Sequence, residues 1–153
     1  MIKLKELVFF IFTTLAIGFM GSFLGDQSIY NEFTKPDFAP PSYIFSLVWT
    51  ILYILMGISV YMIYMSKDDL KRKKALNVYI IQLIVNATWT LLFFGLELRL
   101  FAFIWILLLI LLVLIMINRF YTINRIAANL QIPYLIWLVF ASLLNYSVYI
   151  LNQ

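Results

Sequence analysis

Long stretches without charged side chains alternate with short charged segments along the chain. The charge-free stretches are residues 7–25, 43–65, 75–96, 100–118 and 126–152. An α-helix needs about 20 such residues to cross the hydrocarbon core of a bilayer. The pattern predicts an all-α integral membrane protein, with residues 1–153 forming one domain, a bundle of five transmembrane helices. We expect the spans at about 7–25, 43–65, 75–96, 100–118 and 130–151.

Composition supports a membrane protein and excludes several kinds of chemistry. Hydrophobic residues make up 65% of the chain and charged residues only 12%, which does not fit a soluble domain. The chain has no Cys and no His, so disulfides, thiol nucleophiles, imidazole bases and zinc sites are excluded. We predict no metal site and no resident cofactor. The first stretch is longer than the apolar region of a signal peptide and lacks a cleavage site, so it is predicted to be a retained span.

The basic residues predict the orientation. Lys and Arg number nine on the side that holds the amino terminus and the second and fourth loops, against two, Lys35 and Arg99, on the other. Because basic loops stay in the cytoplasm, we expect a multi-pass protein of the cell membrane, its amino terminus cytoplasmic and its carboxyl terminus outside. The basic run at residues 71–74 is better explained as this topology signal than as a lipid or nucleic-acid patch.

The loop between the first two spans, residues 26–42, is long and contains Pro36, Pro40 and Pro41. It also carries Tyr30 and Phe33, apolar surface that a solvated linker does not need. Long loops of this kind are typically functional, so we expect it to be a lid whose order depends on ligand.

Amides and aromatic rings recur at helical spacing inside the predicted spans, where no charged residue lies at mid-membrane. Such stripes are either contacts between helices or the walls of a cavity for a flat, hydrophobic, conjugated ligand. The stripes are Gln82, Asn86 and Thr90 with Trp89 and Phe93; Phe45, Trp49, Tyr53 and Gly57; and Trp137, Ala141, Leu144 and Asn145. The absence of buried charge argues against an ion-coupled carrier.

Small residues recur four apart on the first span, as Gly18 with Ser22 and Gly21 with Gly25. This spacing allows close helix packing, either within the bundle or in a homodimer.

Three segments together resemble the tryptophan-rich sensory protein and translocator protein family (TspO/MBR, the peripheral benzodiazepine receptor family), in a bacterial, Bacillus-type form. The first segment runs from Lys35 through Pro40 and Pro41 to Phe45, Trp49 and Gly57. The other segments comprise Gln82, Asn86, Trp89 and Phe93 to Gly95, and Pro133, Tyr134, Trp137, Ala141 and Leu144 to Tyr146.

The resemblance implies a membrane protein that binds protoporphyrin IX or a related tetrapyrrole, and isoquinoline carboxamide or benzodiazepine-type drugs, in a pocket under the first loop. It also implies light- and oxygen-dependent degradation of the porphyrin, with Trp49 and Trp137 as the catalytic residues. The alternative is a receptor, sensor or transporter for porphyrin or lipid without enzymatic activity. By motif position the ligand-binding residues are Pro41, Phe45, Val48, Trp49, Tyr53, Asn86, Trp89, Trp137, Ala141 and Leu144. From the fourth span, Phe101 or Ile106 is the suggested addition.

Three departures from the family pattern bear on the ligands. The first loop holds Asp26, Glu32 and Asp37 against Lys35, so it has no evident surplus of cations for porphyrin propionates. Ala39 stands where mammalian members have His before the double proline, and no Lys or Arg follows Tyr146, as the cholesterol motif requires. The expected partners are therefore tetrapyrrole, drug and membrane lipid, with neither cholesterol nor nucleic acid predicted.

Overall fold

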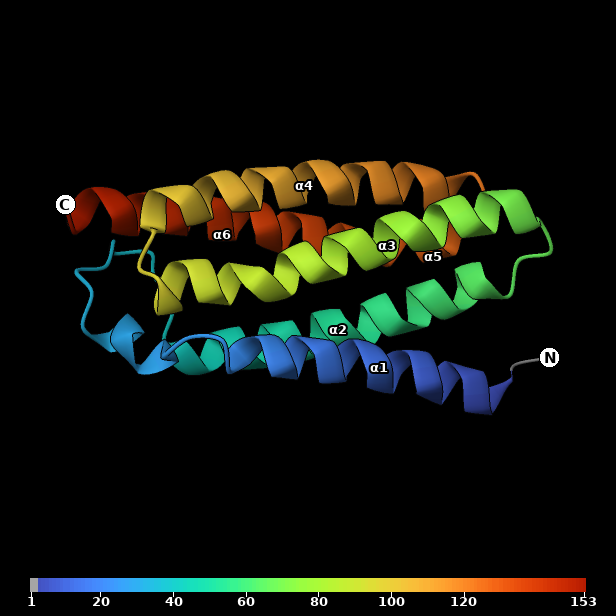
Figure 1. Cartoon of the computed structure of the whole chain (residues 1–153), viewed down its shortest axis with the longest axis horizontal. Helices are drawn as coiled ribbons and strands as arrows, with labels where there is room; N and C mark the ends of the chain where they lie inside the picture. Colours follow the sequence, from blue (N-terminus) through green and yellow to red (C-terminus); the bar gives the residue numbers. More distant parts are fainter. Residues whose placement is uncertain (1–2) are drawn as a thin grey trace.

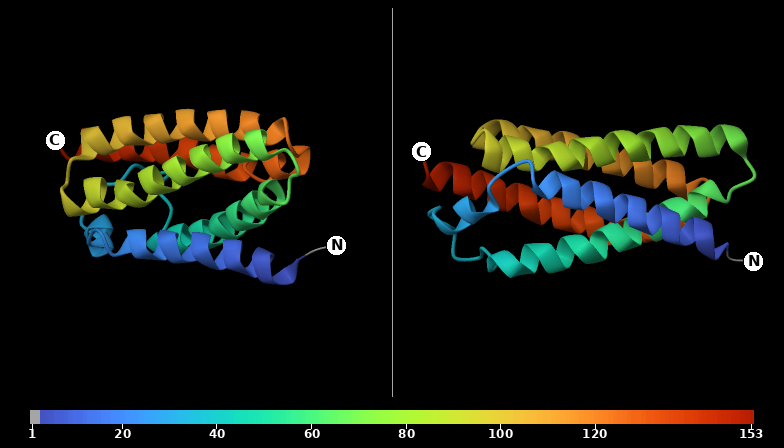
Figure 2. Two further views of the ribbon diagram at one scale, coloured as in Figure 1. Left: turned by 45° about the vertical axis from the view of Figure 1, so that its right-hand side comes forward. Right: turned by 60° about the horizontal axis from the view of Figure 1, so that its bottom comes forward.

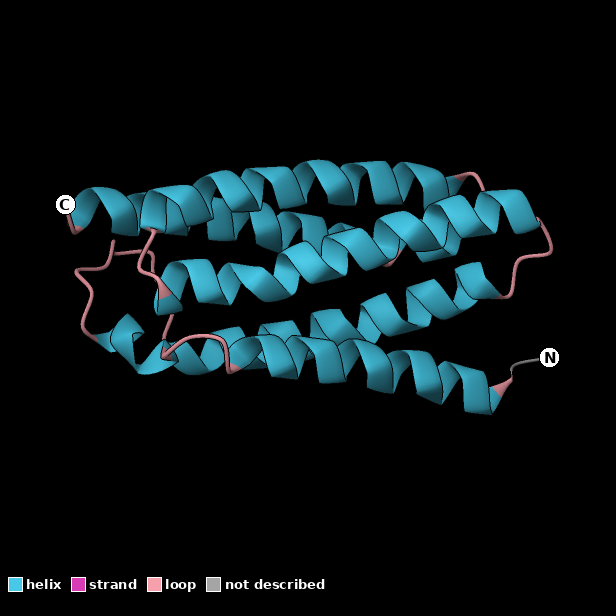
Figure 3. Ribbon diagram, in the orientation of Figure 1, coloured by secondary structure: helices cyan, strands magenta, loops and turns pink. Residues whose placement is uncertain are grey.

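The computed structural model describes residues 3–153, and this part of the chain is helical with no β-strand (Figure 3). Five of its helical segments are long and apolar enough to cross a membrane. The all-α membrane bundle predicted from the sequence is confirmed. The elements are α1 (Leu4–Ser22), η1 (Gln27–Asn31), α2 (Ser42–Tyr64), α3 (Asp69–Thr90), η2 (Leu91–Gly95), α4 (Arg99–Tyr121), α5 (Arg125–Asn129) and α6 (Ile132–Leu151).

The helices run along one long axis, with the amino and carboxyl termini at opposite ends (Figure 1). Helix α1 packs on α2 and α3, while α4 packs on α3 and α6. Short helix α5 rests against α4 and α2. The views in Figure 2 show the segment between α1 and α2 at the end of the bundle that holds the carboxyl terminus. We call this the connection end, and the other the amino-terminal end.

Glycines allow α1 to approach its neighbours closely. A Cβ atom at Gly57 of α2 would lie 2.6 Å from Cα of Ile11 in α1. A Cβ at Gly21 would lie 3.1 Å from the backbone of Ala87 in α3, and one at Gly25 would lie 2.7 Å from the carbonyl oxygen of Thr90. The glycines at 21 and 25 therefore serve contacts within the bundle, which is one of the two uses predicted for their spacing.

Helix α3 begins at Asp69, before the charge-free stretch, so its first two turns carry the basic run. The side chain of Asp68 accepts a hydrogen bond from the backbone N–H of Lys71 at 3.0 Å and caps the helix. This bond lowers the pKa of Asp68, and the nearby Lys71 side chain lowers it further. Lys71 pairs with Asp68 at 3.4 Å, and Lys73 with Asp69 at 2.7 Å. The acids beside the run thus offset part of its charge.

The last charge-free stretch divides into two helices. Asn124 caps α5 by accepting hydrogen bonds from the backbone N–H groups of Ile126 and Ala127, at 2.9 and 3.1 Å. Helix α6 starts at Ile132 with Pro133 in its first turn, where a missing N–H costs nothing.

The connection between α1 and α2, residues 23–41, has regular structure in part. It contains the 3-10 helix η1, whose cap is Asp26 accepting from the backbone N–H of Ser28 at 2.9 Å. Hydrogen bonds from the hydroxyl and the backbone N–H of Ser28 lower the pKa of Asp26. Tyr30 and Phe33 are buried, so the connection packs against the bundle rather than extending into solvent.

Candidate functional site

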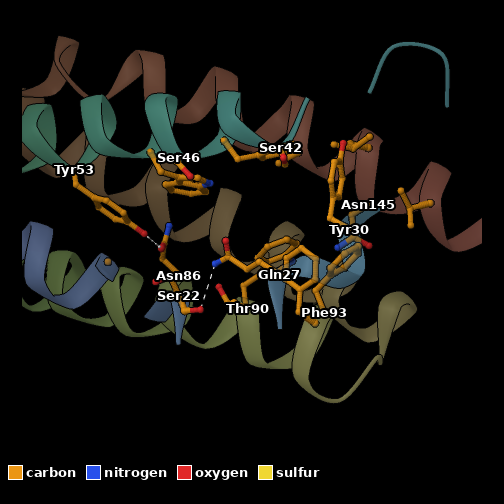
Figure 4. A pocket seen from close by; sticks show the side chains of 18 residues that line it. Ser22, Gln27, Tyr30, Ser42, Ser46, Tyr53, Asn86, Thr90, Phe93 and Asn145 are labelled. Atoms are coloured by element: carbon orange, nitrogen blue, oxygen red, sulfur yellow. Dashed lines mark hydrogen bonds between the residues drawn. The ribbon is translucent and has the colours of Figure 1, made fainter. Parts of the chain in front are cut away.

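A cavity of about 180 Å³ lies at the connection end, enclosed by α1, α2, α3, η2 and α6 and covered by η1 (Figure 4). Most of its surface is apolar, and every charged side chain of the described residues lies outside its lining. The lining residues are Gly18, Ser22, Gln27, Tyr30, Ser42, Phe45, Ser46, Trp49, Tyr53, Asn86, Trp89, Thr90, Phe93, Phe94, Ala141, Leu144, Asn145 and Val148.

Aromatic rings join α2 to α6 on one side of the cavity. The ring of Phe45 lies 5.7 Å from that of Trp137, and the ring of Trp49 lies 6.0 Å from that of Tyr134, centroid to centroid. Both pairs are edge-to-face, a geometry that aromatic rings prefer. Trp49 also stacks on Tyr53 of its own helix at 5.4 Å. Flat, apolar surfaces therefore form this wall.

A chain of hydrogen bonds forms the polar floor. The hydroxyl of Tyr53 donates to Oδ1 of Asn86 at 2.8 Å, as the dashed line in Figure 4 shows. Nδ2 of Asn86 donates to the hydroxyl of Tyr134 at 2.7 Å, and that hydroxyl donates to Oε1 of Gln82 at 3.0 Å. Asn86, Gln82 and Tyr134 are buried, so this chain fixes the relative positions of α2, α3 and α6.

The opposite wall is built by η2, a π-helical turn that follows α3. The ring of Trp89 stacks on Phe93 at 5.0 Å, and Phe93 meets Phe94 edge-to-face at 4.7 Å. Asn145 of α6 satisfies both ends of its amide in the orientation in which Oδ1 accepts from Nε1 of Trp89 at 3.2 Å and Nδ2 donates to the carbonyl of Arg99 at 2.9 Å. Asn145 thus holds the Trp89 ring in place.

Two cationic side chains pack on aromatic rings of the connection. Nζ of Lys35 is 4.6 Å from the ring centroid of Tyr30, and Cζ of Arg99 is 4.5 Å from that of Phe33. The hydroxyl of Tyr30 donates to the carbonyl of Pro40 at 2.9 Å, and burial raises the pKa of Tyr30. Among residues 3–153, no three acidic, His or Cys side chains are close enough to hold a metal ion. The lining thus offers flat apolar contact and neutral hydrogen-bonding groups.

Comparison with known proteins places this bundle in a family. Residues 10–151 match the TspO/MBR family. The chain belongs to this family. It is 38% identical to the "Tryptophan-rich protein TspO" of Archaeoglobus fulgidus, covering 98% of this chain and 99% of that one. It is also 32% identical to the "Tryptophan-rich sensory protein" of Cereibacter sphaeroides, covering 86% and 82% of the two chains. Its identity to the human "Translocator protein" is 30%, covering 85% and 82%.

Seven of the ten ligand-binding residues expected for a TspO/MBR protein line the cavity. They are Phe45, Trp49, Tyr53, Asn86, Trp89, Ala141 and Leu144. Trp137 lies one layer behind, in contact with Phe45 and Phe140. Val48 packs against the deeper core, and Pro41 is exposed at the start of α2. Ile106 is buried in the bundle away from the cavity and Phe101 is exposed, so neither suggested residue of α4 lines it.

The remaining lining residues are not among the binding residues that the TspO/MBR resemblance implies. Thr90, Phe93 and Asn145 stand on the predicted stripes, so helical spacing alone marks them. Ser42 and Ser46 lie one turn apart on the same face of α2 as Tyr53. Gln27 and Tyr30 come from the connection, where no periodic pattern in the sequence indicates which side chains turn inward.

Proposed function

We propose that the cavity binds protoporphyrin IX or a related flat tetrapyrrole and promotes its light- and oxygen-dependent degradation. The observation that carries the proposal is an apolar cavity with aromatic rings on facing walls, Trp49 on α2 and Trp89 with Phe93 at η2. A conjugated macrocycle offers two flat faces to such walls. Isoquinoline carboxamide drugs, which are also flat and apolar, are expected to compete for the same space.

The energy of binding has to come mostly from apolar burial. A micromolar complex needs about 8 kcal/mol, and an aromatic pair adds about 0.5–1.5 kcal/mol beyond the area it buries. Three rings therefore supply at most about 4.5 kcal/mol, well short of the total. The polar floor at Asn86 and the hydroxyls of Ser42 and Ser46 would orient polar substituents rather than supply affinity.

The lining residues leave one kind of chemistry open. With neither His nor Cys in the chain, and no acid in the lining, there is no general base and no activated nucleophile. The bound porphyrin would absorb the light and accept an electron from an indole, and the reduced ring would pass that electron to dioxygen to give superoxide. The indole radical would then regain an electron from the porphyrin, and the oxidised ring would combine with superoxide, so that dioxygen is the net oxidant and the indole is restored. Trp49, which lines the cavity, is the proposed direct donor, and Trp137 behind Phe45 is the proposed second donor.

A second candidate is a receptor, sensor or transporter for porphyrin or lipid that binds without chemistry. It is favoured by the same lack of acid–base groups in the lining. The names of two relatives, "Tryptophan-rich sensory protein" and "Translocator protein", fit sensing or transport.

For the membrane, we propose that the amino-terminal end of the bundle faces the cytoplasm and the connection end faces outward in the cell membrane. The amino-terminal end carries nine basic residues against Lys35 and Arg99 at the other. The cavity would then open toward the outer side.

Titration of the purified protein with protoporphyrin IX, followed by its absorbance first in darkness and then in light, tests the proposal. We expect saturable binding and light-dependent loss of the porphyrin when oxygen is present. Saturable binding without loss in light would leave the receptor alone, and no saturable binding would end both candidates.

A matched pair of variants shows whether the cavity is the binding site. Ala141→Phe places a ring inside the cavity, whereas Leu143→Phe adds one to the exposed face of the same helix. Only the first should abolish binding of porphyrin and drug. Equal binding by both variants would place the ligand elsewhere.

A further inference from the structure

Asn152, directly after α6, holds the backbone of Thr34, which lies 118 positions earlier in the chain. Oδ1 of Asn152 accepts from the backbone N–H of Thr34 at 3.0 Å. Nδ2 of Asn152 donates to the backbone carbonyl of Thr34 at 2.9 Å and to that of Val148 at 2.8 Å. Both peptide groups of Thr34 are thus paired with one amide, which is itself held at the end of α6. This arrangement fixes the orientation of the amide.

The preceding residue, Phe33, is held by the same side of the bundle. Its ring is buried, lies 5.7 Å from that of Phe93 and has the Arg99 guanidinium 4.5 Å from its centroid on the α4 side. Arg99 in turn pairs with Glu97 at 2.9 Å. We call Phe33, Thr34, Arg99 and Asn152 the clasp.

The position of the clasp relative to the cavity suggests its role. The connection leaves α1 and returns to α2, yet the clasp fastens it to η2, α4 and α6, on the other side of the cavity. Tyr30, three residues before Phe33, lines the cavity and hydrogen-bonds Pro40 near the far end of the connection. The connection therefore crosses the cavity at the connection end and is held in place by residues on the other side.

We propose that the clasp controls how fast a ligand enters and leaves the cavity, with the Asn152–Thr34 hydrogen bonds as the part that opens. Thr34 is exposed and Asn152 is partly exposed, so water can replace these bonds, as is typical of segments that open locally. Asn152 does not line the cavity, so its replacement removes no contact with a ligand bound there. Loosening it should raise the association and dissociation rates by the same factor and leave the equilibrium affinity unchanged.

The kinetic test rests on the proposed function, because it uses protoporphyrin IX as the probe. Stopped-flow measurement in darkness should show that Asn152→Ala raises both rate constants about tenfold, equivalent to about 1.4 kcal/mol of lost closure, with Kd within about twofold of wild type. Asn152→Asp keeps the acceptor for the Thr34 N–H and loses both donors, so its rates should fall between. Asn31→Ala changes an exposed asparagine of the same connection that makes no side-chain hydrogen bond in the described structure, and should leave the rates unchanged.

Hydrogen exchange at the Thr34 amide, measured without ligand, tests the clasp independently. The amide should be protected in the wild type and in Asn31→Ala, and should exchange faster in Asn152→Ala. Three results would each overturn the proposal that the clasp controls ligand entry and exit. They are a Thr34 amide that is unprotected in the wild type, rate constants that do not change in Asn152→Ala, and a rise in the dissociation rate alone with a weaker Kd. Absence of porphyrin binding by the wild type would overturn the proposed function and with it the gating role. A failure of the clasp alone would instead show as normal wild-type binding with no effect of Asn152→Ala.

Discussion

Gly18 of α1 lies directly against the ring of Tyr53 in α2. A Cβ atom at Gly18 would be 2.6 Å from Cδ2 of Tyr53 and closer still to Cε2 and Cζ. Because Gly18 has no side chain, the Tyr53 ring can lie against α1, and its hydroxyl donates to Oδ1 of Asn86 at 2.8 Å. Gly18 of α1 thus determines the position of the Tyr53 ring of α2 and its hydrogen bond to Asn86 of α3.

Gly18→Ala should weaken ligand binding as well as the fold. The added methyl group forces the Tyr53 ring away from α1 and into the cavity, and overpacking of this kind costs about 1–3 kcal/mol. We expect Kd for protoporphyrin IX to rise about tenfold or more. The measurement is a fluorescence titration in darkness together with thermal unfolding in detergent.

Gly21→Ala is the matched control, since the same methyl group would meet the backbone of Ala87 and leave Tyr53 untouched. It should lower the melting temperature without changing Kd. Equal affinities for the two variants would show that Tyr53 yields without narrowing the cavity.

Asn86→Leu should destabilise the bundle by breaking the polar floor. Leucine is close in size but leaves the part-buried hydroxyl of Tyr53 without its acceptor, which costs about 1–3 kcal/mol. Chemical unfolding in detergent should show this loss. Asn77→Leu, on the exposed part of the same helix, should have little effect.

A double variant separates the lost partner from the change in packing. Removing both members of a buried hydrogen bond is less costly than removing one, so Tyr53→Phe combined with Asn86→Leu should recover part of the stability. No recovery would argue that the Tyr53–Asn86 bond contributes little.

The sequence predicted the helices well because their signal is long and simple. A charge-free stretch of about 20 residues has few alternatives to a transmembrane helix, since backbone groups in lipid must bond within the segment. The stripe on α3 was also readable, because Gln82, Asn86 and Thr90 do share one face and the last two line the cavity.

Other parts of the site depend on features that spacing does not encode. The π-helical turn at Leu91–Gly95 adds a residue to the turn, so Phe94 reaches the cavity beside Phe93, although α-helical spacing marks only Phe93. Trp137 shares a face of α6 with Ala141 and Leu144, but the Phe45 ring packs against it and only the other two line the cavity, a difference that spacing does not encode. The contribution of Gln27 and Tyr30 arises from the path of the connection, which tertiary contacts determine.

The orientation of the bundle can be measured with single cysteines, because the chain has none of its own. In intact cells, an impermeant maleimide should label Gln153→Cys at the connection end and fail to label Leu70→Cys, an exposed site at the amino-terminal end. Both should react after the cells are opened. The reverse pattern in intact cells would invert the topology inferred from the basic residues.

The last prediction separates the roles of Trp49 and Trp137. Phenylalanine keeps a flat apolar ring but lacks the easily oxidised indole, so Trp49→Phe should bind protoporphyrin IX within a few-fold of wild type and degrade it much more slowly in light. Trp137→Phe should slow degradation less, because Phe45 stands between that indole and the cavity. It should also fold at least as well as wild type, since Nε1 of Trp137 is buried with no hydrogen-bond partner in the described structure.

Trp105→Phe is the control for this series. Its indole lies outside the cavity and donates to the carbonyl of Val85 at 3.0 Å, so stability can fall while binding and degradation per bound porphyrin stay constant. The measurements are the dark affinity and the rate of porphyrin loss under fixed light and oxygen. If binding and degradation fall together in Trp49→Phe, Trp49 contributes only contact surface in the cavity wall and no electron. Wild-type degradation rates in both Trp49→Phe and Trp137→Phe would remove these two indoles from the mechanism. The oxidisable groups left in the lining would then be the indole of Trp89 and the phenols of Tyr30 and Tyr53.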